Sequence, residues 1–97
     1  MSRHYCVYIM TNKPNGILYI GVTSNLPRRV YEHQKDLFEG FTKRYGLKFL
    51  VYYEIYPTPY EAIQAEKRMK KWNRAWKVRR ILKMNPDWKD LSRDMID

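Results

Sequence analysis

The fold is decided by two stretches of the sequence, Tyr5-Cys6-Val7-Tyr8-Ile9-Met10 and Ile17-Leu18-Tyr19-Ile20-Gly21-Val22. Each is a short apolar run rich in β-branched and aromatic side chains, a composition typical of strands. The residues between them include Asn15-Gly16, a dipeptide that tolerates the positive φ of a tight turn. We therefore predict a β-hairpin in which Tyr8 and Tyr19 lie opposite or diagonal to each other. Both phenols then line one surface if their faces agree.

A helix is predicted over about residues 26–37, because the capping side chains of residues 23–25 are followed by Pro27, which suits a first helical turn. One stripe of this helix is predicted to collect four side chains that lie within about 40° of Leu26 around the axis: Leu26, Val30, His33 and Leu37. Arg29 lies at the edge of this stripe, one turn before His33. The helix is thus predicted to point an imidazole and a guanidinium toward the sheet on which it packs.

Further along the chain, the pattern predicts one strand and two helices, over residues 49–55, 59–73 and 75–84. The loop that precedes this strand is expected to contain one short helical turn around residues 41–45. Thr58 can cap the first of the two helices, because Pro59 follows it and Glu61 lies three residues away, as in a capping box.

The apolar face of the 59–73 helix is predicted to consist of Ala62, Ile63, Ala65, Met69 and Trp72. Glu66 projects at about 40° from Ala62 and therefore falls inside this face. A carboxylate in an apolar face is uncommon unless it is paired or bound to a metal. The simpler explanation is an ordinary ion pair with Lys70, four residues further on.

Basic residues dominate the second half of the chain. In total, 19 Lys and Arg against 10 Asp and Glu give a formal charge of +9. No acidic residue occurs from 67 to 86, a range that contains Lys67, Arg68, Lys70, Lys71, Arg74, Lys77, Arg79, Arg80 and Lys83. A polyanion is the natural partner, because neutralising phosphates releases their counterions. Nucleic acid is favoured over an anionic membrane or a merely solvated face, with predicted contacts at Lys67, Lys70, Lys71, Arg74 and Lys77.

The length of 97 residues predicts a single domain over 1–97. Trp88 and Leu91 are expected to fold back on the core, and residues 92–97 to fray. Cys6 is the one cysteine, so a disulfide within the chain is excluded, and a buried structural thiol is favoured over a reactive one. No apolar run approaches the ~18 residues of a membrane span, and no signal peptide is evident. We expect a monomer in the cytoplasm.

Each candidate functional residue also has an ordinary explanation. A strand tyrosine usually packs with its hydroxyl in water. Arg29 can pair with Glu32, and His33 taken alone is more often a satisfied core histidine than a catalytic one. Trp72 and Trp76 are interpreted as core residues rather than as platforms for base stacking.

The order and spacing of these residues, however, resemble the GIY-YIG nuclease domain. The resemblance is carried by Cys6-Val7-Tyr8, Tyr19-Ile20-Gly21, Val22-Thr23-Ser24-Asn25-Leu26-Pro27-Arg28-Arg29-Val30-Tyr31-Glu32-His33 and Ala65-Glu66-Lys67-Arg68-Met69-Lys70-Lys71-Trp72. It extends over residues 4–84 and leaves 85–97 as a C-terminal tail. More narrowly, the chain is similar to the small, stand-alone members related to the N-terminal nuclease domain of the excinuclease C protein.

The resemblance implies an α+β fold, in which a three-stranded antiparallel sheet is flanked by helices, and a divalent-metal-dependent phosphodiesterase site. Tyr8 and Tyr19 match the two motif tyrosines, Arg29 the catalytic arginine, His33 a frequent histidine and Glu66 the metal-binding glutamate. Cys6 and Val7 replace the Gly and Ile of the first motif, a mild departure because those positions mainly pack. Val22 stands where some members have a lysine, so any role of that lysine is absent or is taken by another cation.

The chemistry of these residues suits phosphodiester hydrolysis. A single carboxylate can anchor Mg²⁺ or Mn²⁺ when the phosphate supplies a further ligand, and Arg29 can donate a planar fork to that phosphate. A nearby metal and guanidinium are expected to favour phenolate, so that either Tyr8 or Tyr19 takes the proton from water with assistance from His33. We expect an endonuclease that acts on DNA, in repair or recombination, with RNA left as the open alternative for the substrate. A protein partner is expected to supply targeting. The alternative is a nucleic-acid-binding or repair-complex module with little activity.

Overall fold

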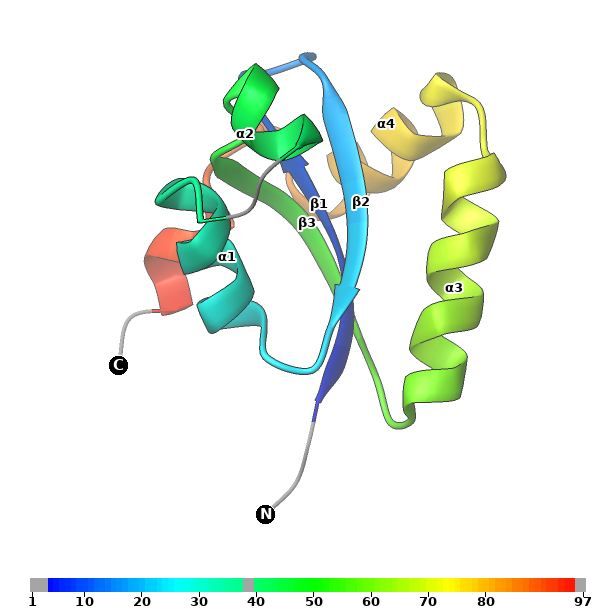
Figure 1. The fold of residues 1–97 in the computed structure, drawn as a ribbon. Helices are drawn as coiled ribbons and strands as arrows, with labels where there is room; N and C mark the ends of the chain where they lie inside the picture. Colours follow the sequence, from blue (N-terminus) through cyan, green and yellow to red (C-terminus); the bar gives the residue numbers. More distant parts are fainter. Residues whose placement is uncertain (1–3, 38–39, 96–97) are drawn as a thin grey trace.

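The computed structural model describes residues 4–37 and 40–95, which form an α+β fold with a three-stranded antiparallel sheet (Figure 1). In chain order the elements are β1 (Tyr5–Thr11), β2 (Leu18–Thr23), α1 (Leu26–Gln34), α2 (Phe41–Tyr45), β3 (Phe49–Tyr56), α3 (Pro59–Lys71), α4 (Arg74–Met84) and the 3₁₀ helix η1 (Leu91–Met95). Figure 1 shows α1 and α2 on one side of the sheet and α3 and α4 on the other. None of the helices in the described part has the length and apolar character needed to cross a membrane.

The strand order β2-β1-β3 places the first strand at the centre of the sheet. Tyr8 pairs with Gly21 and Met10 pairs with Tyr19 across the hairpin, so the two tyrosines are diagonal neighbours on one face. The hairpin turn has Asn15 at a positive φ of 58°, as the Asn-Gly pair predicts. The predicted hairpin is therefore confirmed, and the diagonal arrangement is the one adopted.

Side chains alternate along β1 between two hydrophobic clusters, one on each face of the sheet. On the α3 side, Val7 and Ile9 are fully buried against helix residues that include Ala62, Ala65, Met69 and Ile81. On the α1 side, Cys6, Tyr8 and Met10 pack with Leu26, Val30, Leu47 and Leu50. Cys6 is thus a buried structural residue, as predicted, and burial raises the pKa of its thiol. Because both faces of β1 are covered, a polar group carried by this strand lies deep inside the molecule.

The first helix is shorter than the sequence pattern indicated. It ends at Gln34, and Leu37, which we predicted on its buried stripe, is 63% exposed. The amide of Leu37 donates to the Glu32 carbonyl at 2.9 Å, the amide of Asp36 donates to the His33 carbonyl at 3.2 Å, and Asp36 has a φ of 55°. This is the Schellman arrangement that closes a helix, with Asp in the left-handed position where Gly is usual. The absence of a glycine at the end of the helix is why the sequence did not mark it.

The strand and helices predicted for the C-terminal half are present, although the predicted 59–73 helix ends two residues earlier, at Lys71. Thr58 accepts a hydrogen bond from the Glu61 amide at 3.2 Å, so the predicted N-cap is confirmed, and its hydroxyl donates to the Glu61 carboxylate at 2.9 Å. Ile63, however, is 39% exposed and does not belong to the buried face of α3. The predicted fraying of residues 92–97 is wrong as far as Met95, because the Asp90 carboxylate accepts bonds from the Ser92 amide and hydroxyl and begins η1. Residues 96–97 lie outside the described part.

A hydrogen-bonded chain of three side chains fastens α1 and α2 to the sheet. The Tyr8 hydroxyl lies 2.9 Å from Nε2 of His33, and Nδ1 of His33 lies 3.1 Å from Oγ1 of Thr42. All three residues are buried. Burial lowers the pKa of His33, the Arg29 charge lowers it further, and Glu32 opposes the shift. A neutral imidazole fits this chain if Nδ1 donates to Thr42 and Nε2 accepts from Tyr8.

This arrangement predicts a pH dependence of folding stability. The pKa of His33 lies below the 6.5 of an unperturbed histidine, so below that pH the unfolded chain binds a proton that the folded chain does not. The contribution of His33 to the free energy of unfolding should therefore be fully present above about pH 6.5. It should be lost as the pH falls toward the lower pKa of the folded state. Urea unfolding at pH 7.5 and 5.5 should show this decline in the wild type and a smaller decline in His33→Gln. His4→Gln is the matched control, because His4 is exposed. If His33→Gln and the wild type lose the same free energy of unfolding between pH 7.5 and 5.5, the prediction is contradicted.

Candidate active site

Two phenols and an imidazole from three different elements form a compact cluster on the α1 face of the sheet. The ring centroids of Tyr8 and Tyr19 are 6.3 Å apart, and the His33 ring lies 5.7 Å from Tyr8 and 5.5 Å from Tyr19. Tyr8 is completely buried, whereas Tyr19 is partly exposed. Tyr19 is therefore the phenol that a molecule in solution can reach, and Tyr8 lies behind it.

The glycine of the Tyr-Ile-Gly segment makes room for the buried phenol. Gly21 pairs with Tyr8, and a Cβ built on Gly21 would lie 2.5 Å from the Tyr8 hydroxyl oxygen and 2.6 Å from its ring carbon Cζ. No side chain can occupy that space without moving the tyrosine ring. Gly21 is thus needed for the Tyr8 ring to lie against β2 with its hydroxyl in hydrogen-bond contact with His33. Sequence reasoning had placed Gly21 in the motif without giving it this function.

Burial dominates the electrostatics of Tyr8. It raises the pKa of the phenol, the neighbouring Tyr19 adds to the effect, and Arg29 lowers the pKa through its charge and a hydrogen bond. The net direction is upward, so Tyr8 is a neutral phenol near neutral pH. We expected phenolate from a metal and a guanidinium acting together; the guanidinium alone does not offset the effect of burial, because removal from water outweighs the attraction of one cation.

Arg29 lies at the rim of the cluster, where α1 turns its basic side toward Tyr8. Its side chain is 36% exposed, and its Nε is 3.5 Å from Oε1 of Glu32. The ion pair that we considered as the ordinary explanation is therefore present. The same guanidinium also acts on Tyr8 and on His33, since its charge contributes to the pKa of both. A partly exposed guanidinium held beside the buried Tyr8 phenol is suited to binding an anion from solution.

Glu66 comes from the opposite layer of the fold. It lies on α3, which packs against β1 and β2, and its neighbours Ala62 and Ala65 are buried. Its side chain is 16% exposed and Oε2 lies 3.4 Å from Nζ of Lys70. The carboxylate is nevertheless close enough to Tyr8 for its charge to raise the pKa of that phenol. The predicted position of Glu66 within the apolar face is thus confirmed, and so is the i,i+4 pair.

The described residues offer a metal ion a small set of protein ligands. Among residues 4–37 and 40–95, no three His, Cys, Asp or Glu side chains come together as a metal cluster. Mg²⁺ commonly keeps several waters and takes only one or two carboxylates together with substrate phosphates. One partly buried carboxylate, Glu66, fits a metal of that kind, and does not fit zinc, which needs three or four protein ligands.

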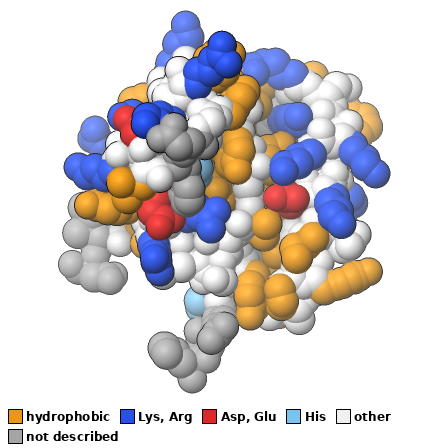
Figure 2. Space-filling model, viewed as in Figure 1, with side chains coloured by type: hydrophobic (Ala, Val, Ile, Leu, Met, Phe, Trp, Pro, Cys, Tyr) orange, Lys and Arg blue, Asp and Glu red, His pale blue; other side chains and the backbone are white. Residues whose placement is uncertain are grey.

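The predicted nucleic-acid contacts differ in what they do in the fold. Lys67, Lys70 and Lys71 are exposed on α3. Arg74 instead donates two hydrogen bonds to the hairpin turn, at 2.8 Å to the Asn15 carbonyl and 2.7 Å to the Gly16 carbonyl. Figure 2 shows Lys and Arg side chains gathered around this face of the molecule, including its α3 side. The basic surface therefore borders the site, although Arg74 also has a structural role and Lys77 is half-buried.

Some residues of the site were not found from the sequence. Thr42 holds the far nitrogen of His33, and Phe41 stacks beside Tyr19 with a centroid distance of 6.5 Å. Both lie on α2, a short helix between two glycines, and no local pattern points to a role for them. The helical turn at 41–45 was predicted, but what it contacts depends on the tertiary structure.

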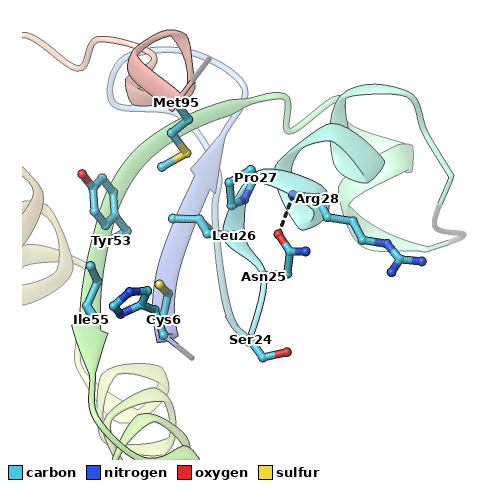
Figure 3. A pocket seen from close by; sticks show the side chains of 10 residues that line it. Cys6, Ser24, Asn25, Leu26, Pro27, Arg28, Tyr53, Ile55 and Met95 are labelled. Carbon is cyan, nitrogen blue, oxygen red and sulfur yellow. Dashed lines mark hydrogen bonds between the residues drawn. The ribbon is translucent and has the colours of Figure 1, made fainter. Parts of the chain in front are cut away.

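A separate hollow lies on the same face of the sheet, where α1 begins (Figure 3). Its volume is about 640 Å³, and side chains of Cys6, Leu26, Tyr53, Ile55 and Met95 contribute to its lining. Figure 3 also shows Asn25, whose side chain accepts a hydrogen bond from the Arg28 amide and caps α1. None of the predicted catalytic residues lines this hollow, so we assign the candidate site to the tyrosine cluster.

Comparison with known proteins identifies the family of this chain. Residues 4–91 match the model of the GIY-YIG catalytic domain. The UPF0213 protein SH2523 of Staphylococcus haemolyticus is 35% identical over 81 residues, which cover 84% of this chain and 96% of that protein. A UPF0213 protein of Bacillus pumilus is 31% identical over 74 residues, 76% of each chain. The solution NMR structure of the UPF0213 protein BH0048 from Bacillus halodurans superimposes with a TM-score of 0.55 at 26% identity, covering 91% of this chain and 92% of that one. The chain therefore belongs to the GIY-YIG catalytic domain family, a family of nuclease-like domains, and is similar throughout to its UPF0213 members.

Proposed function

We propose that this protein is a divalent-metal-dependent endonuclease that hydrolyses phosphodiester bonds in DNA. The observation that carries the proposal is the meeting of Tyr8, Tyr19 and His33 beside the Arg29 guanidinium, with the Glu66 carboxylate within electrostatic reach. Packing alone does not require phenols, an imidazole, a guanidinium and a carboxylate in one place. Phosphodiester hydrolysis uses all of these groups.

Arg29 is assigned the binding of the scissile phosphate. Its planar guanidinium can donate two parallel hydrogen bonds to phosphate oxygens and stabilise the charge that develops on them. Glu32 lies on the same helix and holds the side chain from one side. Arg28, the preceding residue, also pairs with Glu32 but has 75% of its side chain exposed, and we assign it no part in the reaction.

Glu66 is assigned the binding of the metal ion. When bound, Mg²⁺ or Mn²⁺ would polarise the phosphate and stabilise the leaving oxygen. The ammonium of Lys70 lies 3.4 Å from the same carboxylate and would have to move away from it when a metal ion binds. The exposed position of the Lys70 ammonium, with 53% of the side chain in solvent, permits such a movement.

Tyr19 is assigned the transfer of the proton from water, which leaves Tyr8 in a supporting role. The fully buried Tyr8 has a raised pKa and a hydrogen bond to His33, so it is suited to fixing the cluster rather than to meeting water. Tyr19 is partly exposed and lies against the edge of the His33 ring.

A second function is favoured by one contact. Because Lys70 already places a cation on Glu66, the basic surface could bind DNA without a metal and without cleavage. Such a nucleic-acid-binding module, in a repair or recombination assembly, would use the Lys and Arg of α3 and α4 but would not need Tyr19 or Arg29. The substitutions below distinguish the two functions.

Replacing Glu66 with glutamine should abolish Mg²⁺-dependent cleavage while leaving the fold and DNA binding in place. Loss of the metal should lower kcat/KM by more than about 100-fold, since metal-ion catalysis supplies several kcal/mol. Nicking of plasmid and of branched and nicked duplexes measures the effect. Glu61→Gln is the matched control on the same helix, because glutamine also serves in a capping box. Equal cleavage by Glu66→Gln and the wild type would refute the assignment of the metal site.

Two neighbouring arginines provide a matched test of phosphate binding. Arg29→Lys keeps the charge but loses the planar fork, and should lower kcat by roughly 10²- to 10³-fold, the usual cost of removing a donor to the transition state. Arg28→Lys should leave kcat within about twofold, because Arg28 is 75% exposed, has no part in the assigned reaction and keeps its positive charge as lysine. Single-turnover cleavage of a labelled duplex measures both. A similar kcat for the two variants would exclude the role assigned to Arg29.

Removing only the hydroxyl of each tyrosine should affect kcat and stability differently at the two positions. Tyr19→Phe should reduce kcat by about 10²- to 10⁴-fold, the range for loss of a proton-transfer group. Tyr8→Phe should have a smaller effect on kcat and a larger one on stability, by about 1–3 kcal/mol, because it removes a buried partner of His33. Cleavage kinetics and urea unfolding of both variants provide the comparison. If Tyr8→Phe loses more activity than Tyr19→Phe, the order of the two phenols proposed here is wrong.

A further inference from the structure

A second hollow opens where α3 gives way to α4, and its lining is aromatic and basic. Its volume is about 370 Å³, and it is lined by Trp72, Trp76, Arg79, Arg80 and Lys83. No carboxylate contributes to the lining. It is separate from the tyrosine cluster, since the two have no residue in common.

The two tryptophans are held at an angle that leaves one of them accessible. Their ring centroids are 6.3 Å apart and their planes are inclined at 74°. Trp72 is half-buried and packs against the core, and the guanidinium of Arg80 lies 5.3 Å from its ring centroid. Trp76 is 52% exposed. Our expectation that both are core residues is therefore wrong for Trp76, because the chain turns at Asn73 and α4 starts in a new direction.

The charges around this hollow are only partly neutralised. Arg80 lies 3.9 Å from Glu54, a carboxylate that also accepts hydrogen bonds from the hydroxyls of Tyr52 and Tyr56. Among residues 4–37 and 40–95, neither Arg79 nor Lys83 has a carboxylate within ion-pair distance. Both are exposed. Two cations are thus available to an anionic ligand beside an exposed indole ring.

We propose that this hollow binds an unpaired nucleotide in a single-stranded segment next to the cleavage site. Single strands are recognised by stacking of bases on aromatic side chains and by basic groups that follow the backbone, and both elements are present. The proposal rests on the proposed function in two respects: the substrate is DNA, and its scissile phosphate lies near Glu66. In this assignment the base stacks on Trp76, and Arg79 and Lys83 contact the adjacent phosphates.

The position of the hollow relative to Glu66 fits a segment of the same substrate. Trp72 follows Glu66 by six residues along the chain, which corresponds to about 9 Å along a helix axis. Stacked nucleotides are spaced about 3.4 Å apart along one strand. A strand whose scissile phosphate is near Glu66 would therefore reach the hollow after a few nucleotides. Duplex DNA is a poorer occupant, because its base faces are covered by stacking and cannot meet an indole ring.

Binding in the absence of metal tests this inference without cleavage. Fluorescence anisotropy in EDTA gives the Kd of a labelled duplex with a tail of eight thymidines and of the same duplex with blunt ends. Trp76→Ala should weaken binding of the tailed duplex by about 5- to 100-fold, the range for loss of one base stack, and leave the blunt duplex within twofold. Trp76→Phe should retain most of the affinity. Tyr60→Ala, at an aromatic residue that is 62% exposed on α3, is the matched control and should change neither Kd.

A charge variant provides a second measurement that does not depend on the indole ring. Arg79→Gln should reduce the slope of log K against log salt by about one for the tailed duplex, because one phosphate contact is lost. If Trp76→Ala and Tyr60→Ala bind the tailed duplex equally well, or Trp76→Ala weakens the tailed and blunt duplexes alike, the inference is overturned. If a peptide of eight glutamates displaces the tail as effectively as an oligothymidine of equal charge, the hollow is assigned to an acidic protein partner instead.

The two proposals can fail independently. Cleavage that is indifferent to Glu66→Gln would remove the proposed function, yet the binding measured in EDTA would still report on Trp76. Conversely, a tail that binds without Trp76 would overturn the inference about the hollow and leave the assignments of Glu66, Arg29 and Tyr19 untouched.

Discussion

The hydrogen bond between the Tyr8 hydroxyl and Nε2 of His33, at 2.9 Å, joins the central strand to α1 in the interior of the molecule. Much of the site depends on it. Burying a phenol and an imidazole is costly unless each finds a partner, and here each satisfies the other while Thr42 satisfies the second nitrogen. The chain of three side chains therefore fixes the rotation of α1 and the place of α2 against the sheet. Gly21 is part of the same constraint, because any side chain there would occupy the space of the Tyr8 ring.

Once α1 is fixed in this way, its other side chains have determined positions. Arg29 is one turn before His33, so the rotation that buries the imidazole brings the guanidinium to the rim of the cluster. Glu66 arrives from the other layer, where Ala62, Ala65 and Met69 bury the same face of α3 against the sheet. A cation and an anion thus approach the phenols from opposite sides of β2.

Burial and exposure divide the two tyrosines between different tasks. Removal from water raises the pKa of Tyr8 and keeps it a neutral hydrogen-bond donor, which suits a structural role within the cluster. Tyr19, on the edge strand, is open to solvent on one side and can meet a substrate. The same contrast appears outside the cluster, where Trp72 is held by the core and Trp76 is not. In each pair, two residues of the same type lie close together. They differ in exposure because other segments cover only one of them.

The sequence by itself determined the hairpin, the capping of α1 and α3, the burial of Cys6, and the family resemblance that pointed to Tyr8, Tyr19, Arg29, His33 and Glu66. These follow from local chemistry: turn residues, caps and apolar periodicity act over a few positions. Only the tertiary structure decided where α1 ends, that Leu37 and Ile63 are exposed, that Thr42 supports His33, and that Arg74 holds the hairpin turn. It also decided that Tyr8 is the buried phenol and that Trp76 is accessible. The physical reason is that exposure, pKa and hydrogen-bond partners depend on which distant segments cover a residue, and no pattern of neighbouring residues records that.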